Sequence, residues 1–165
     1  MNRPDLTSTQ LAILAMIRAK DKNGVDYAPI PGRIHLVKEL FAIYTTDVGK
    51  KVLRDLRFEP DNFGPFDETI FAGLDELTDA GLVKTVAEKN VAKIELTPAG
   101  KRIIDDLWAK IRPEIKQVIE YVKHNYNHKS SETVLKDIYA AHPEMAVNSF
   151  SKVAIKYKPQ ERQPT

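Results

Sequence analysis

The chain has 165 residues, and its 25 Lys and Arg against 23 Asp and Glu leave a formal net charge of only +2. So small a net charge gives no electrostatic argument for a nucleic-acid partner. Cysteine is absent, which excludes disulfides, thiol catalysis, thiolate zinc sites and iron–sulfur clusters. No apolar run reaches the roughly 20 residues of a membrane span, and residues 1–10 lack a secretory layout. We therefore expect a cytoplasmic protein.

The first half of the chain shows four segments with the apolar spacing of helices. They cover residues 7–20, 32–44, 48–57 and 67–80. Asp67 is placed to cap the last of these helices, and Gly81 is placed to end it. Asn, Gly and Pro residues over 21–31, and again between Pro60 and Pro65, are typical of loops and breaks.

The second half begins with two strand-like segments. Residues 82–88 and 91–97 alternate as strands do, and a turn between them completes a hairpin. Thr97 and Pro98 then fit the cap and the first position of a helix. Its apolar stripe continues past Pro113, and a further helix is predicted near 132–141. We expect a mainly α fold with one small β-hairpin, organised as a domain over 1–112, a helical extension over 113–155 and a flexible tail over 156–165.

Two sequence motifs resemble those of winged helix-turn-helix regulators. LDELTDAGLV, residues 74–83, resembles the end of their recognition helix, and ELTPAG, residues 95–100, resembles the exit of their wing, as in the MarR and PadR groups. With the two upstream helices, the resemblance spans residues 7–112. It implies a winged-helix domain in a DNA-binding transcriptional regulator that acts as a dimer. The run from Phe63 to Phe66, FGPF, is also similar to the Gly-Pro entry of Panacea-type antitoxins.

Acidic residues dominate the segment that a winged-helix protein places in the major groove. Residues 61–80 hold six acids and no Lys or Arg, and the phosphates of a duplex repel such a segment. This pattern supports an alternative, a protein-interaction module of the antitoxin or adaptor kind that binds a basic protein partner. The candidate contact residues of that alternative are Glu68, Asp75, Glu76 and Asp79.

Basic residues gather just before this acidic segment. Lys50, Arg54 and Arg57 recur at i, i+4 and i+7, so a helix over 48–57 places them on one face. Such a face either docks on a phosphate backbone or is an ordinary solvated surface. Residues 66–80 contain none of the Arg, Lys, Asn or Gln that read bases. We therefore expect binding mainly through phosphates. The candidate DNA-binding residues are Lys50, Lys51, Arg54, Arg57, Lys84, Lys89 and Lys93.

A long apolar stripe after Pro98 predicts a homodimer. It exceeds what a small core needs, and exposed apolar stripes usually mark interfaces. The candidate interface residues are Ile104, Leu107, Trp108, Ile111, Ile115, Val118, Val122 and Tyr126. The alternative is that the last helix folds back and covers this stripe within one chain.

Catalytic and metal-binding motifs do not stand out. The sequence holds no Walker loop, Rossmann glycine pattern, nucleophile elbow or zinc-binding helix motif. His124 and His128 share a helix face, but Glu120 lies roughly 12 Å from His128 along a helix, too far to join it on one ion. We expect a protein that is not an enzyme and that uses no cofactor or metal.

Overall fold

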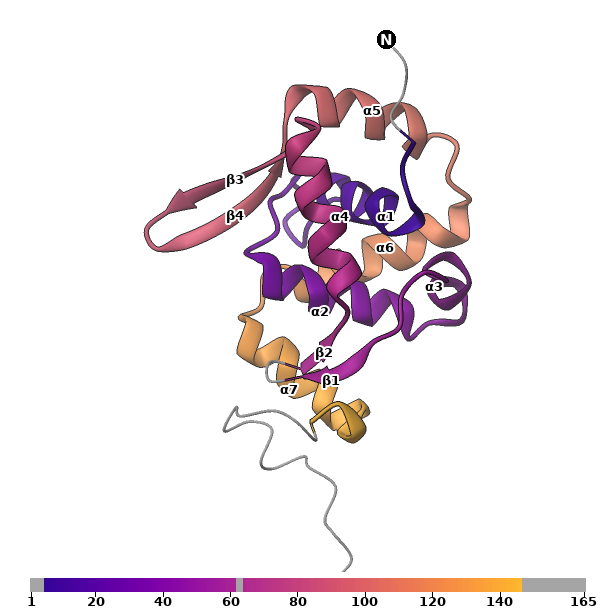
Figure 1. Ribbon diagram of the computed structural model, residues 1–165, viewed down its shortest axis with the longest axis vertical. Helices are drawn as coiled ribbons and strands as arrows, with labels where there is room; N and C mark the ends of the chain where they lie inside the picture. The colour runs from indigo at the N-terminus through magenta and orange to yellow at the C-terminus, as the bar shows by residue number, and fades with distance from the viewer. Residues whose placement is uncertain (1–4, 62–63, 147–165) are drawn as a thin grey trace, which may run out of the picture.

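The computed structural model describes residues 5–61 and 64–146. The first half contains three helices, a hairpin and a fourth helix: α1 (Ser8–Arg18), α2 (Arg33–Tyr44), α3 (Asp47–Val52), β1 (Glu59–Asp61), β2 (Gly64–Phe66) and α4 (Glu68–Asp79). The second half contains a longer hairpin, three helices and a 3-10 turn: β3 (Val83–Glu88), β4 (Val91–Leu96), α5 (Pro98–Trp108), α6 (Pro113–Tyr126), α7 (Ser131–Ala141) and η1 (Pro143–Ala146). This confirms a mainly helical fold with a small hairpin (Figure 1). The predicted tail and the end of the predicted extension lie outside the described residues.

Local capping fixes the ends of α4 and α5. Asp67 accepts a hydrogen bond from the backbone N–H of Thr69 at 2.9 Å, which caps α4. Gly81, with φ at +76°, follows the end of that helix in the left-handed conformation that suits glycine. Thr97 caps α5, and Pro98 occupies the first position of that helix. The sequence predictions for all these positions are confirmed.

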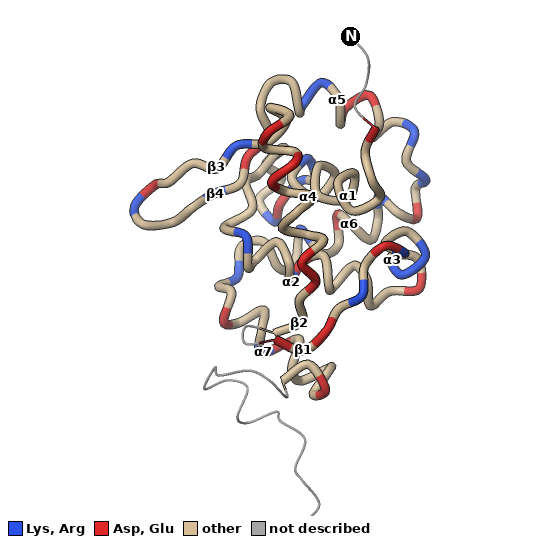
Figure 2. The backbone as a smooth tube through the Cα atoms, in the orientation of Figure 1, with Lys and Arg blue, Asp and Glu red and all other residues tan. Residues whose placement is uncertain are grey.

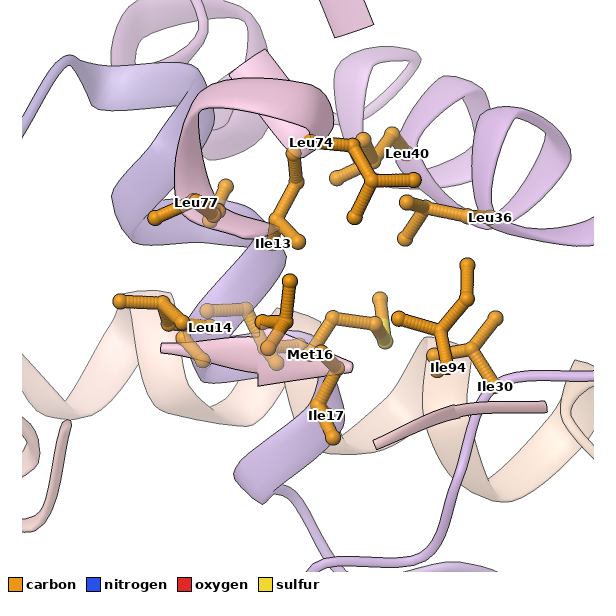
Figure 3. Packing of buried hydrophobic residues seen from close by; sticks show 14 of the residues in the cluster. Ile13, Leu14, Met16, Ile17, Ile30, Leu36, Leu40, Leu74, Leu77 and Ile94 are labelled. Carbon is orange, nitrogen blue, oxygen red and sulfur yellow. The ribbon is translucent and has the colours of Figure 1, made fainter. Parts of the chain in front are cut away.

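Helix α1 lies at the centre of the core. Ile13 and Met16 of this helix are fully buried. Leu74 of α4 packs beside Ile13, whereas Met16 extends toward Ile94 of β4 (Figure 3). Helices α5 and α6 contact α1 as well. Each fully buried aliphatic side chain of this kind contributes about 1.5–3 kcal/mol to stability, so α1 is the element on which the core is built.

The β3–β4 hairpin projects from the body of the protein (Figure 1). Lys89 and Asn90 form its turn with φ at 49° and 66°, as a two-residue turn with positive φ at both positions requires. At the base, Ile30 pairs with Ile94 through two backbone hydrogen bonds of 3.0 and 2.8 Å. The loop between α1 and α2 therefore extends the hairpin by one bridge.

Two predictions for residues 48–66 are wrong. The helix expected over 48–57 ends at Val52, because Leu53 leaves the helical region and a short turn buries both Leu53 and Leu56. The expected break between Pro60 and Pro65 forms part of the β1–β2 hairpin, in which these two prolines are paired. Proline lacks the N–H of a ladder bond, so a strand with proline is tolerated only where no donor is needed, as at an edge.

The apolar stripe after Pro98 is divided between α5 and α6, which residues 109–112 separate. Ile104, Trp108 and Val122 are buried inside the chain itself and offer no surface to a partner. The remaining predicted interface residues are only partly buried: Leu107, Ile111, Ile115, Val118 and Tyr126. Helices α1 and α2 cover much of the stripe, whereas α7 packs on α2 and β2. Among the described residues, no helix is long and apolar enough to cross a membrane.

Candidate interaction surface

Helix α4 turns a row of acids toward solvent. Its apolar residues, among them Leu74 and Leu77, face the core, which leaves the opposite side of the helix exposed. Figure 2 shows acidic positions at the start of this helix and again in its second half. The exposed acids are the four predicted from the sequence: Glu68, Asp75, Glu76 and Asp79.

Two of these acids have partners within the chain. Asp75 forms an ion pair with Arg33, whose guanidinium also lies 4.7 Å from the ring centre of Phe71. Glu76 accepts a hydrogen bond from the side-chain amide of Gln10 at 2.6 Å. Arg33 neutralises the charge of Asp75, whereas the neutral amide of Gln10 leaves the charge of Glu76 in place.

An acidic hollow of about 610 Å³ lies beside the N-terminal end of α4. Arg57 is the one cation among the residues that line it. Five carboxylates line the same hollow: Asp55, Glu59, Asp61, Asp67 and Glu68. We call this hollow together with the exposed face of α4 the acidic surface.

The carboxylates of the hollow differ in what they already bind. Asp67 accepts the backbone N–H of Arg57 at 2.6 Å as well as the cap bond of α4. Asp55 accepts the hydroxyl of Thr9 at 2.6 Å. Glu59 and Glu68 are exposed, as are Asp55 and Asp61, whereas Asp67 is half-buried.

Of the five carboxylates of the hollow, the sequence predicted only Glu68 as a site residue and missed the other four: Asp55, Glu59, Asp61 and Asp67. The β1–β2 pairing places Glu59 opposite Phe66, and so brings residues 59–61 beside the start of α4. Pro60 before residues 62–63 and Gly64 and Pro65 after them are a turn signal that is compatible with a hairpin. If the sequence had been taken to predict a hairpin at residues 59–66, that hairpin would have placed these acids together.

The basic helix face predicted from Lys50, Arg54 and Arg57 does not form. Lys50 and Lys51 are exposed on α3, but Arg54 lies in the turn after that helix and Arg57 lies in the acidic hollow. The i, i+4, i+7 spacing requires a helix through residue 57, and the helix ends five residues earlier. Only the two lysines keep the predicted placement on one helix.

The hairpin lysines lie apart from α3. Lys84 is 3.9 Å from the carboxylate of Glu95, and Lys93 is 3.8 Å from that of Glu88. Lys89 is exposed at the turn. The hairpin and α3 stand on opposite sides of the molecule, with the acidic α4 between them (Figure 2). The predicted DNA-binding residues therefore do not gather on one surface.

A buried lysine joins α6 to α1. The ammonium group of Lys123, which is fully buried, donates to the carbonyl oxygens of Met16, Ile17 and Ala28 at 2.8, 3.0 and 2.6 Å. Burial lowers the pKa of Lys123 to about 8, and the nearby carboxylate of Glu39 opposes this shift. No signal in the sequence separates this lysine from the solvated lysines of an amphipathic helix.

His35 and Glu39 of α2 complete this buried polar cluster. The ring atom Nε2 of His35 is 3.0 Å from the carbonyl oxygen of Tyr126 and 3.5 Å from Oε1 of Glu39. Both neighbours are acceptors, so the proton is assigned to Nε2. Burial raises the pKa of Glu39, while His35 and Lys123 oppose that rise. These groups are enclosed in the core, and they hold α2 and α6 together.

A separate apolar pocket of about 260 Å³ opens between α1, α3 and α6. Its walls include Ala15 of α1, Val52 of α3 and Val118 of α6, and Lys110 and Arg112 also line it. Three residues of the predicted dimer interface lie in these walls: Ile111, Ile115 and Val118. These partly exposed residues of the apolar stripe after Pro98 therefore line a concave pocket.

Comparisons with known proteins add no relative. No protein-family model matches this chain, and none of the curated proteins compared with it is a match. Within residues 5–61 and 64–146, no three His, Asp or Glu side chains are grouped so as to hold a metal ion. The case for a function therefore rests on the surfaces described above.

Proposed function

We propose that this protein is an interaction module that binds a basic segment of another protein through its acidic surface. One observation carries the proposal: the hollow beside α4 gathers five carboxylates around a single guanidinium. Glu68 of α4 lines this hollow, and Asp75, Glu76 and Asp79 follow about two turns further along the same helix. A concave surface with this charge suits Arg or Lys side chains projecting from a partner.

The strength of such a contact follows from its exposure. A single exposed ion pair contributes about 0–1 kcal/mol, so recognition needs several carboxylates acting together. A partner arginine is favoured over a lysine, because its guanidinium can meet a carboxylate with two parallel hydrogen bonds. Salt weakens the contact, since exposed charges are screened over about 8–10 Å at physiological ionic strength.

A second candidate function is DNA binding by a dimeric winged-helix regulator. The observation in its favour is the order of elements, in which α4 is followed by a hairpin whose base pairs with the segment before α2. Two features rank it second. Residues 45–67 separate α2 from α4, whereas a helix-turn-helix is joined by about 3–4 residues. The acids of α4 would also face the phosphates of a bound duplex.

One titration separates the two candidates. A labelled deca-lysine peptide and a short labelled DNA duplex are each titrated with the protein at several salt concentrations. The test variant carries Glu59→Gln, Glu68→Gln and Asp79→Asn. The control variant carries Glu114→Gln, Glu120→Gln and Glu132→Gln, which removes the same charge from exposed positions on α6 and α7.

The proposal predicts that wild type binds the peptide at low salt. The test variant should bind it about tenfold more weakly, in line with three exposed ion pairs, and the control should stay within about twofold of wild type. Equal weakening by both variants would show that net charge alone acts, and would overturn the proposal. Tighter binding of the duplex, with a steep salt dependence, would favour the second candidate.

A further inference from the structure

The apolar pocket carries an inference that is independent of the proposed function. We propose that it binds a small amphipathic carboxylate, a molecule with an alkyl or fused-ring body and one acidic group. The body lies between α1, α3 and α6, and the carboxylate meets Lys110 and Arg112 where they line the pocket.

The volume of the pocket limits the size of the ligand. At about 260 Å³, it exceeds the engineered cavity of about 150 Å³ that holds benzene. It falls just below the roughly 300–1,000 Å³ of pockets for drug-sized ligands. An alkyl chain of about eight to ten carbons, or a fused two-ring system, suits this range.

The position of α3 explains why the space remains open. Helix α3 has only six residues and ends at Val52. Gly49 holds this helix against the end of α2, so closely that a Cβ on Gly49 would overlap the carbonyl oxygen of Ile43. Because that contact sets where α3 lies, the helix cannot shift freely to close the gap in front of Ile115 and Val118 of α6.

Two cations and a helix terminus select the charge of the ligand. Lys110 and Arg112 are exposed, and neither forms an ion pair within the described part of the chain. Both precede Pro113, the first residue of α6, whose N-terminus has no side-chain cap. The partial positive charge of the helix N-terminus adds to the two side chains, and the acid of the first turn, Glu114, is exposed and does not line the pocket. An anionic head group is therefore favoured over a neutral one of equal size.

A second copy of the chain is the competing occupant, because the sequence predicts a dimer interface that includes Ile111, Ile115 and Val118. A stable interface buries about 800 Å² on each partner. A pocket of about 260 Å³ admits one or two side chains, so by itself it is too small to be such an interface. Its apolar walls and paired cations match one small molecule better.

The test compares decanoate with decanol, which has the same chain length and no charge, by isothermal titration calorimetry. One variant, Val118→Trp, fills the pocket from α6, and a second, Val52→Phe, fills it from α3. A third carries Lys110→Gln and Arg112→Gln. Its control carries Lys20→Gln and Arg102→Gln, two exposed cations that do not line the pocket. Circular dichroism establishes that each variant is folded.

Wild type should bind one decanoate, and bind it more tightly than decanol. Each filling variant should lose at least about tenfold in decanoate affinity. The Lys110 and Arg112 variant should lose about fivefold for decanoate, the effect of two exposed ion pairs, and nothing for decanol; its control should match wild type. Equal affinity for the two probes, no saturable binding, or undiminished binding by a folded filling variant would each overturn the proposal.

The wild-type chain alone provides a further readout. Methyl NMR signals of Ile115 and Val118 should shift on adding decanoate, whereas those of Leu135 and Ile138 on α7, outside the pocket, should not. Shifts confined to α7 would place the ligand elsewhere and overturn the proposal. A change from dimer to monomer in the Val118→Trp variant, with no decanoate binding by wild type, would assign the pocket to a second copy.

Discussion

The ammonium group of Lys123 lies 2.6 Å from the carbonyl oxygen of Ala28, although 95 positions separate these residues in the chain. The same group reaches the carbonyls of Met16 and Ile17 in the last turn of α1. The final carbonyls of a helix have no partner within the helix, and a cation there is also favoured by the helix dipole. Lys123 therefore caps α1 from a different helix.

Replacing Lys123 with Met should destabilise the fold by about 3 kcal/mol. The change removes the donor of hydrogen bonds to three carbonyls and a cation that interacts electrostatically with the buried Glu39. Urea unfolding followed by circular dichroism measures the effect. Lys136→Met, at an exposed position of α7, is the control and should change the free energy of unfolding by less than about 0.5 kcal/mol. A Lys123→Met protein as stable as wild type would contradict this account of the cap.

The stability difference between wild type and Lys123→Met should increase as pH rises from 8 to 10. The pKa of Lys123 is about 8 in the folded protein, against 10.5 for an ordinary lysine. In this window the unfolded chain binds the proton that the folded chain has lost, so the free energy of unfolding rises with pH. Lys38 also has a pKa of about 8 through burial, but its contribution is the same in both proteins and cancels. Urea titrations at pH 8, 9 and 10 test this, and a constant difference would contradict it.

Two helical glycines should respond in opposite ways to alanine. A Cβ on Gly100 would overlap the carbonyl oxygen of Leu82, so Gly100→Ala should destabilise the fold by about 1–3 kcal/mol. A Cβ on Gly73 would find its nearest neighbour, a side-chain carbon of Gln10, at 3.4 Å. Gly73→Ala should be neutral or stabilising, because alanine favours a helix interior by about 1 kcal/mol. Thermal unfolding compares the two; an unchanged melting temperature for Gly100→Ala would contradict the close approach of α5 to Leu82.

Arg33→Gln tests the electrostatics of the acidic surface. The change removes the cation that neutralises Asp75, so deca-lysine should bind about two- to threefold more tightly, an effect the size of one exposed ion pair. Stability should fall by less than about 1 kcal/mol, because the side chains of Arg33 and Asp75 are 42% and 64% exposed. Arg102→Gln removes the same charge from α5 and is the control. Equal tightening by both variants would show that the peptide responds only to net charge.

The success of sequence prediction here follows the range of the interactions involved. The cap at Asp67, the stop at Gly81 and the start of α5 at Pro98 depend on neighbours within three residues, and the structure confirms them. The β1–β2 hairpin depends on distant residues. A Cβ on its Gly64 would approach Leu135 of α7 at 2.6 Å, and no local pattern reveals that contact.

In the candidate site too, the sequence predicts features that depend on local patterns and misses those that depend on distant residues. The sequence alone predicts the acids of α4, because like charges on one helix face are a local pattern. It does not predict their partners, because Arg33 and Gln10 lie 42 and 66 positions from Asp75 and Glu76. The prediction of a basic helix face over 48–57 is wrong for a related reason. Burying Leu53 and Leu56 in a turn stabilises the chain more than continuing the helix would.

The central place of α1 has a consequence for biosynthesis. Seven consecutive apolar residues, 11–17, fill the middle of α1, and the residues that share their core cluster include Leu74, Ile104 and Val122. Its carbonyl cap, Lys123, is translated more than a hundred residues after Met16. The nascent chain must carry α1 incompletely covered until α5 and α6 have been made, which slows folding and exposes the chain to aggregation. Any cut that removes α6 would leave the last turn of α1 without its carbonyl cap.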